Sequence, residues 1–310
     1  YLAQLYRRRL YNLAMETNPV KSHLLRDETD LQRLRAFLKQ LPHESNMGDF
    51  EEQIQLPAIR STARLWERGD EIIAIAYVDA GNNLRYAIAD GHRSDLLEKE
   101  ILEWGLTCMR QRNTEGSDQT LDISCRADDL EQLRFIEKFG FEREPIRSLD
   151  YSRSLTEPIE DHPLPSGFTM RSVTGENEVD ALVALHRAAF GTDNMTVEER
   201  LAIMRAPQYV PDLDLVAVAP NGDLSAFCIC GFDESDTQIG FTDPIGTHSR
   251  YQRLGLGKAI LSAGLRALQE RGVTVAEVGT SSHNIPMQKL AERCGFACVS
   301  ENLWFSKKVS

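Results

Sequence analysis

Apolar and polar residues alternate along this chain with two periods, and the second half shows both most clearly. In residues 176–190 and 256–271, apolar side chains recur three or four positions apart, a spacing that predicts amphipathic helices. Short apolar runs bounded by turn residues predict strands. The pattern therefore predicts an α/β fold with a mixed sheet. The other predicted helices are 196–205, capped by Thr196, and 285–294, and the predicted strands are 167–174, 214–220, 224–232, 238–247, 273–280 and 298–309.

Landmarks of the chain recur after half its length. In each half a helix ends in a Gly-Phe turn, and the two turns are 155 residues apart. A Gly-Asp turn followed by two strands, the second ending in Asp, recurs at an offset of 153 residues. Two independent landmarks at nearly one offset indicate a duplicated unit. The matching pairs are Gly140 with Gly295, Gly69 with Gly222, and Asp90 with Asp243.

A junction separates the two predicted units. Residues 155–167 hold three prolines and three acidic residues without helical or strand period, which is typical of a linker. With 310 residues, the chain is also longer than one average domain. We therefore expect a domain at 1–155, a linker at 156–166 and a domain at 167–310.

Composition narrows the setting and the partners. No apolar run approaches the roughly 18 residues of a membrane span, and the start of the chain does not resemble a signal peptide. The six cysteines form no C-x-x-C pair, so we expect no metal and a reducing, cytoplasmic setting. A net charge of −12 argues against nucleic acid and permits a cationic small molecule, although such a charge is also common in soluble proteins.

Two glycines lie where a predicted strand passes into a helix, in the sequence Gln-Arg-Leu-Gly-Leu-Gly at 252–257. The amino end of a helix offers unpaired N–H groups that suit a phosphate, and glycine removes the side chain that would hold the anion away. A Walker A loop is excluded because Gln252 replaces its first glycine and Ala259 its Ser or Thr. The dinucleotide fingerprint fails at Ile260, which replaces its third glycine.

This hexapeptide resembles motif A of the GNAT superfamily of acyl-CoA-dependent N-acetyltransferases, [QR]-x-x-G-x-[GA]. Residues 279–296 resemble the next conserved block: a strand, an Asn, a helix and Gly-Phe. The resemblance is strong over 167–310 and weaker over roughly 20–155. It implies two tandem GNAT-fold domains with a degenerate N-terminal one, similar to mycothiol-synthase-like architectures.

The resemblance also implies acetyl-CoA as cosubstrate and a position for each of its parts. The pantetheine arm would pair with a splayed fourth strand at Ile245, Gly246 and Thr247. Asn284 would contact the cofactor or serve as a plain helix N-cap, and both roles remain open. The pyrophosphate would meet backbone N–H groups of Arg253, Leu254, Gly255, Leu256, Gly257 and Lys258.

The resemblance fails at the usual acid of the reaction. Many GNATs carry a tyrosine in the last helix, and Ala291 occupies its position. A base must keep the attacking amine neutral, and the candidates are Asp243 in the fourth strand and Glu277 in the next. Weak candidates for the missing acid are Ser281, Ser282 and His283.

In the first half, only Gly91 stands where motif A belongs, and Asp95 lies near the expected helix start. A carboxylate there would satisfy the N–H groups that otherwise bind phosphate. We therefore expect one cofactor site per chain and a first domain kept for structure or for shaping the acceptor site.

The sequence thus predicts an N-acetyltransferase that moves an acetyl group to a primary amine of a small molecule or peptide by direct attack. We expect neither nucleic acid nor a membrane as partner, and a monomer is compatible with two GNAT units in one chain. The alternative is a non-catalytic acyl-CoA-binding sensor. A nucleotide-binding protein is disfavoured by the failed phosphate motifs.

Overall fold

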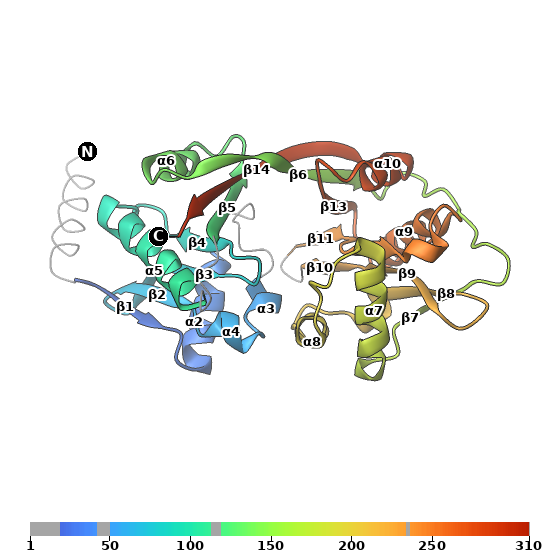
Figure 1. The fold of residues 1–310 in the computed structure, drawn as a ribbon, viewed down its shortest axis with the longest axis horizontal. Helices are drawn as coiled ribbons and strands as arrows, with labels where there is room; N and C mark the ends of the chain where they lie inside the picture. Colours follow the sequence, from blue (N-terminus) through green and yellow to red (C-terminus); the bar gives the residue numbers. More distant parts are fainter. Residues whose placement is uncertain (1–18, 42–49, 113–118, 234–235, 310) are drawn as a thin grey trace. The chain divides into compact units, whose positions relative to one another are not determined.

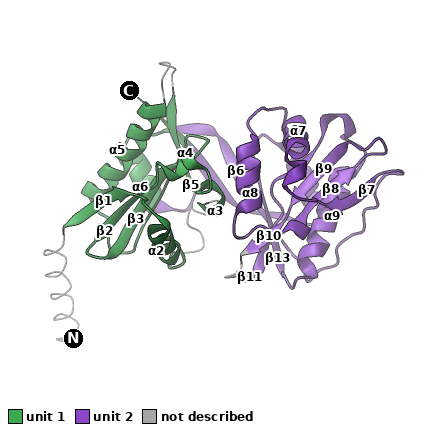
Figure 2. Ribbon diagram, turned by 90° about the horizontal axis from the view of Figure 1, so that it is seen from below, with its two compact units in different colours: residues 1–124, 131–142, 305–310 green, residues 125–130, 143–304 purple. Residues whose placement is uncertain are grey.

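The computed structural model describes residues 19–41, 50–112, 119–233 and 236–309. Contacts divide the chain into two compact units (Figure 2). Unit 1 comprises residues 1–124, 131–142 and 305–310, and unit 2 comprises 125–130 and 143–304. Each unit therefore contains chain from both sequence halves.

Unit 1 is built on an antiparallel sheet of order β1-β2-β3-β4 (Figure 1). The central strand β3 is buried along almost its whole length, because Ile73, Ile75 and Tyr77 on one face and Ala74 and Ala76 on the other are all covered. The strands are β1 (Val20–Leu24), β2 (Arg64–Arg68), β3 (Glu71–Val78) and β4 (Leu84–Ile88). The helices are α2 (Glu28–Leu38), α3 (Phe50–Gln53), α4 (Pro57–Arg60), α5 (Asp95–Arg112) and α6 (Leu130–Lys138).

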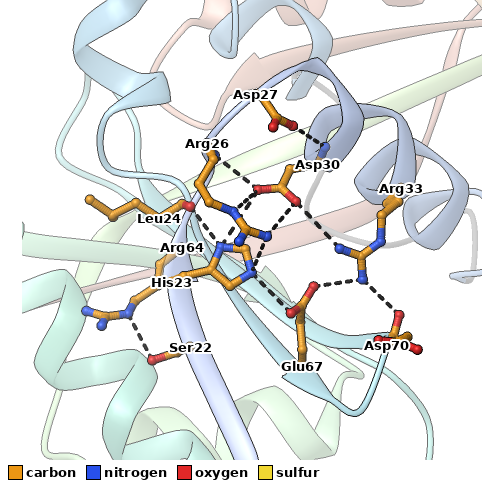
Figure 3. Close-up of polar contacts among 10 residues, drawn as sticks. All are labelled: Ser22, His23, Leu24, Arg26, Asp27, Asp30, Arg33, Arg64, Glu67 and Asp70. Carbon is orange, nitrogen blue, oxygen red and sulfur yellow. Dashed lines mark hydrogen bonds and ion pairs between the residues drawn. The ribbon is translucent and has the colours of Figure 1, made fainter.

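A charged network ties the start of α2 to β1 and β2 (Figure 3). The buried Asp30 carboxylate accepts hydrogen bonds from Arg26 at 2.8 and 3.0 Å, while Asp27 caps α2 by accepting from the Asp30 N–H. Arg33 bridges to Glu67 of β2 at 2.7 Å. The hydrogen bonds from Arg26 hold the pKa of Asp30 below its usual value, so the carboxylate is charged when it makes these contacts.

Unit 2 repeats the sheet order of unit 1, as β7-β8-β9-β12. Its inward residues alternate: Val216 and Phe227 pack under α7, while Leu215 and Cys228 pack under α9 on the opposite face. The strands are β7 (Thr169–Ser172), β8 (Asp214–Val218), β9 (Leu224–Ile229) and β12 (Ile245–Thr247). The helices are α7 (Val179–Phe190), α8 (Val197–Arg205), α9 (Leu256–Gln269) and α10 (Ile285–Arg293), with 3₁₀ turns at Glu176–Glu178, Pro211–Leu213 and Ser249–Tyr251.

A second sheet runs in the order β10-β11-β13-β6-β14-β5. Strand β6 from the first sequence half pairs antiparallel with β13 over seven residues, from Val275↔Ser154 to Ser281↔Ser148. This pairing places residues 143–154 in unit 2, so the spatial units cross the expected boundaries of 1–155 and 167–310, which stay a prediction about the sequence repeat. The strands are β10 (Gly231–Asp233), β11 (Asp236–Phe241), β13 (Val275–Ser281), β6 (Glu142–Ser154), β14 (Ala297–Lys308) and β5 (Thr120–Arg126).

The repeated landmarks occupy matching places. Gly69 and Gly222 both have positive φ in the turns between β2 and β3 and between β8 and β9. Gly140 and Gly295 do the same after α6 and α10. The predicted strand 238–247 is broken at the Asp243–Pro244 bond into β11 and β12, and Thr196 forms the predicted cap, as part of a capping box with Glu199. The predicted α/β class with a mixed sheet is confirmed. Within the described residues, no helix is long and apolar enough to cross a membrane.

Candidate functional site

Strands β11 and β12 follow each other along the chain of unit 2 but belong to different sheets. Strand β11 pairs in parallel with β13 from Ile239↔Val275 to Phe241↔Glu277. After residue 241 the chain leaves β13, and β12 pairs antiparallel with β9, with Gly246 opposite Phe227. The facing edges of β12 and of the end of β13 therefore open away from each other. Backbone N–H and C=O groups at such edges can pair with an extended ligand.

The three residues predicted for the pantetheine arm form β12 itself. Ile245 is buried in the core under α9, while Gly246 and Thr247 are partly exposed. Phe227 and Ala189 lie against Gly246 on the α7 side. The strand is thus held on one edge by β9 and on one face by α7, with its other edge at the opening.

The geometry of the turn before α9 accounts for one of its two glycines. Gly255 has φ +90°, and nothing lies within 4 Å of the position where a Cβ would stand. The left-handed backbone conformation therefore favours glycine at 255, and the space beside its Cα is open. A Cβ on Gly257 would lie 3.4 Å from Leu290 and 3.6 Å from Thr247 Oγ1, which are ordinary contacts. Packing alone thus does not require glycine at 257.

The amino end of α9 carries hydrogen-bond donors that the helix itself does not use. Helix geometry leaves the N–H groups of Leu256, Gly257 and Lys258 without an acceptor inside the helix. The first turn contains no acidic residue, and Gly255 supplies no side-chain cap. The Gln252 side chain donates to the Thr247 carbonyl at 3.3 Å, which ties this turn to β12. The turn therefore presents positive potential beside the opening.

Asn284 is placed at the start of α10, where its side-chain oxygen accepts from the Met287 N–H at 3.2 Å. The cap that the sequence left open as an alternative is thus present. Its contact with a cofactor stays a prediction. Ala291 is fully buried in the core of unit 2, so the usual tyrosine position carries no hydroxyl.

Asp243 and Glu277 are brought to the same face of the second sheet. Oδ2 of Asp243 lies 3.3 Å from the position that a Cβ on Gly279 would take. Gly279 and Glu277 are two residues apart on β13 and so point to one side. Both carboxylates are exposed at the point where β11 leaves β13. This position fits a base, whereas their roles stay predictions.

The weak acid candidates carry structural contacts. Ser281 Oγ accepts from the His283 N–H at 3.1 Å, and Ser282 Oγ accepts from the Arg147 N–H at 3.1 Å. Each hydroxyl still has its proton to donate, so neither is excluded.

A buried charged cluster on the α8 side escaped the sequence analysis. Arg200 of α8 pairs with Asp214 at the start of β8, and the Tyr209 hydroxyl donates to Asp214 at 2.6 Å. Burial raises the pKa of Asp214, while the Arg200 guanidinium opposes that rise. The partners are 14 residues apart and share no motif, so no sequence signal could have joined them.

The surroundings of three buried cysteines disfavour the thiolate form. Contact with the Cys230 thiol and burial raise the pKa of Cys228 well above its usual value. Burial raises the pKa of Cys108 to about 11 and of Cys125 to about 12. Among the described residues, no group of three or more His, Cys, Asp or Glu side chains could hold a metal ion.

The chain is similar to known acetyltransferases. Residues 179–296 match the model of the acetyltransferase (GNAT) family. A mycothiol acetyltransferase of Arthrobacter sp. is 28% identical over 180 residues, covering 55% of either chain. One from Salinispora tropica is 33% identical over 152 residues, covering 47% of this chain and 50% of that protein. The chain thus spans about half the length of the curated relatives it matches.

Solved structures with the same fold cover more of the chain. A tandem GNAT protein from the clavulanic acid biosynthesis pathway superposes with a TM-score of 0.69 at 14% identity, covering 94% of this chain and 99% of that one. A GCN5-related N-acetyltransferase from Sphaerobacter thermophilus gives 0.62 at 20% identity, covering 80% of each. At these identities the likeness shows the fold, and the tandem arrangement predicted from the sequence is confirmed.

Proposed function

Because the second half of this chain carries a GNAT-family acetyltransferase domain within a tandem GNAT fold, we propose that it transfers an acetyl group from acetyl-CoA to a primary amine. The observation that carries the proposal is the opening between β12 and β13 together with the uncapped amino end of α9, whose first turn holds no acid. The relatives' name supports acetyl transfer in general, and the amine acceptor is our extension of it.

The residues present fit acetyl-CoA. The free edge of Ile245–Thr247 suits the amide-bearing pantetheine arm, which can add to it as a strand would. The N–H groups at 256–258 suit the pyrophosphate, and the open space above Gly255 leaves it room. Lys258 and Arg253 add positive charge beside that turn.

The reaction follows as direct attack. The neutral amine nitrogen forms a bond to the thioester carbonyl carbon, and the C–S bond breaks to leave CoA as a thiolate. Asp243, whose carboxylate lies over β13 at the opening, accepts the proton that the amine loses, with Glu277 as the other candidate. Because Ala291 provides no hydroxyl, the thiolate takes its proton from water or from Ser281 or Ser282.

A second candidate is a protein that binds acyl-CoA without turning it over, and the buried Ala291 favours it. The two differ in one assay. With acetyl-CoA and a panel of primary amines, the enzyme releases CoA thiol at a rate that depends on the amine, whereas the sensor binds acetyl-CoA and releases none. Amine-independent binding without thiol release would contradict the transferase.

Variants at the two carboxylates test the mechanism. Asp243→Asn is expected to lower kcat by about 100- to 10,000-fold while the KM for acetyl-CoA stays unchanged, since loss of a general base slows proton transfer. Glu277→Gln is the matched comparison on the same face. Unchanged rates in both variants would mean that neither carboxylate is the base. The amine would then lose its proton to solvent before it attacks.

We also propose that the protein works in a reducing compartment such as the cytoplasm. All six cysteines are free thiols, and five of them are buried.

A further inference from the structure

The face of β13 that points away from α10 is polar and continues onto β6. Ala276 and Val278 of β13 are buried in the core with Tyr151 of β6, which pairs directly with Val278. The residues between them therefore point to the opposite face. On that face Gly279 lies opposite Asp150, and Glu277 lies opposite Ser152.

Gly279 leaves a gap between two carboxylates. On one side, Asp243 Oδ2 reaches over β13 to within 3.3 Å of the absent Cβ position. On the other side, Asp150 stands on the neighbouring strand. Adjacent strands are about 4.8 Å apart, so Asp150 lies one strand spacing from Gly279, and the two carboxylates flank a position that carries no side chain. Any larger residue at 279 would fill this gap.

The Asp150 carboxylate is held in one orientation. Its Oδ2 accepts from Ser300 Oγ at 2.5 Å and from Asn302 Nδ2 at 2.8 Å, both on β14. The polar row continues one step along β6, where Ser148 Oγ accepts from Trp304 Nε1 at 2.8 Å. Two donors on one oxygen fix the direction of the other, and a fixed charge costs less to order when it meets a ligand.

We propose that Asp150 is a specificity-determining residue of the acceptor site, and that it binds a second cationic group of an amine whose first amino group reacts beside Asp243. The inference rests on the proposed transfer to amines. The acceptor is then a diamine or a larger molecule with two cationic nitrogens, lying across Gly279. A monoamine can occupy only the reactive position.

The inference also gives the degenerate first half a role in the active site. Strand β6 belongs to that half of the sequence, yet it lies beside β13 in unit 2. The first half thus contributes a binding residue through a strand, without needing a cofactor site of its own.

The test uses the full chain and measures thiol release with α,ω-diaminoalkanes from 1,3-diaminopropane to 1,8-diaminooctane, each beside the n-alkylamine of equal length. The wild type is expected to prefer the best diamine in kcat/KM. Asp150→Asn should lower that preference by about tenfold or more through the KM for the diamine, as one charge-assisted contact is lost. The KM for acetyl-CoA should not change.

Two further variants separate binding from folding. Asp150→Glu keeps the charge and should retain the preference, shifted toward a shorter diamine. Asp180→Asn removes an exposed carboxylate from α7 of the same unit and should leave the preference unchanged. A ratio of diamine to monoamine is insensitive to partial unfolding, since both substrates meet the same folded fraction.

Calorimetric titration of 1,4-diaminobutane into the acetyl-CoA complex distinguishes a failure of the Asp150 site from a failure of the proposed acetyl transfer. Binding that depends on Asp150 without thiol release would support the site and contradict acetyl transfer. Turnover with the same preference in wild type and Asp150→Asn would contradict the site and keep the transfer. Neither binding nor turnover with any diamine would contradict both.

Discussion

The turns before α9 and before α5 occupy matching places in the two sequence halves but differ in what faces their free N–H groups. Before α9, Gly255 supplies no side chain and the first turn holds no acid. Before α5, Ser94 Oγ accepts from the Leu97 N–H at 3.3 Å, and Asp95 and Glu98 lie in the first turn.

The carboxylates of α5 are themselves neutralised. Lys138 of α6 bonds Asp95 at 2.8 Å and Glu98 at 2.7 Å, and Arg93 bonds Glu98 at 2.9 Å. The amino end of α5 is thus occupied by the chain's own groups, whereas that of α9 has neither a side-chain cap nor an acid in its first turn. The two halves thus share a turn and a helix at this place and differ in the residues that meet the free N–H groups.

The largest effect is expected from placing one acid at each turn. Gly255 and Gly91 both have positive φ, +90° and +77°, and at both nothing lies within 4 Å of an added Cβ. Gly255→Asp should raise the Kd for acetyl-CoA at least about 100-fold, because a carboxylate takes the N–H groups and repels the pyrophosphate. Gly91→Asp should leave the Kd unchanged.

Calorimetric titration of both variants checks this, with thermal midpoints to compare their folding. An equal loss of affinity in the two variants would contradict the assignment of the site to α9 alone.

Each unit anchors its first helix with an arginine–carboxylate pair that lowers the pKa of the carboxyl group, Arg26–Asp30 in unit 1 and Arg171–Glu178 in unit 2. Glu178, beside α7, accepts from Arg171 at 2.5 Å, and this holds its pKa at about 2, below the usual 4.5. Its contribution to stability is complete above pH 4.5 and is lost as the pH falls toward 2, since the unfolded chain binds the proton first.

Glu178→Gln should therefore cost about 1–2 kcal/mol of unfolding free energy at pH 7 and nothing near pH 2, after allowance for the exposure of Arg171. Urea unfolding across that pH range measures it. A constant difference between wild type and variant at all pH values would show that packing, rather than charge, anchors the helix.

A smaller effect is expected at the cation of the α9 turn. Lys258→Met keeps the apolar stem and removes the charge, so the Kd for acetyl-CoA should rise about three- to fivefold at low salt. The difference should shrink as ionic strength rises, since salt screens the exposed charges. A loss that is independent of salt would contradict an electrostatic role for Lys258.

Most of unit 2 could be predicted from the sequence because its periodicities are strong and local. The stripe from Leu256 to Leu268 gives α9, and the hexapeptide at 252–257 gives its turn. Asp243 and Glu277 could be named because each is adjacent to a recognisable element. Their common face followed only when the parallel register of β11 and β13 was known.

The parts that could not be predicted depend on which strands meet. The residues Ser148, Asp150 and Ser152 show plain strand alternation, but nothing local indicates that β6 pairs with β13 of the other half. Likewise, the sequence pointed to Asp95 as the group at the start of α5, whereas the hydrogen bond there is accepted by Ser94 and Asp95 pairs with Lys138. Both features depend on contacts between residues far apart in the sequence, β6 with β13 and Lys138 with Asp95.

The central claim is that one of the two related turns binds the cofactor, and the stoichiometry of acetyl-CoA binding to the full chain tests it most directly. Isothermal titration should give one site per chain, and that site should disappear in Gly255→Asp while Gly91→Asp retains it. Two sites per chain, or a single site that survives Gly255→Asp, would contradict the account.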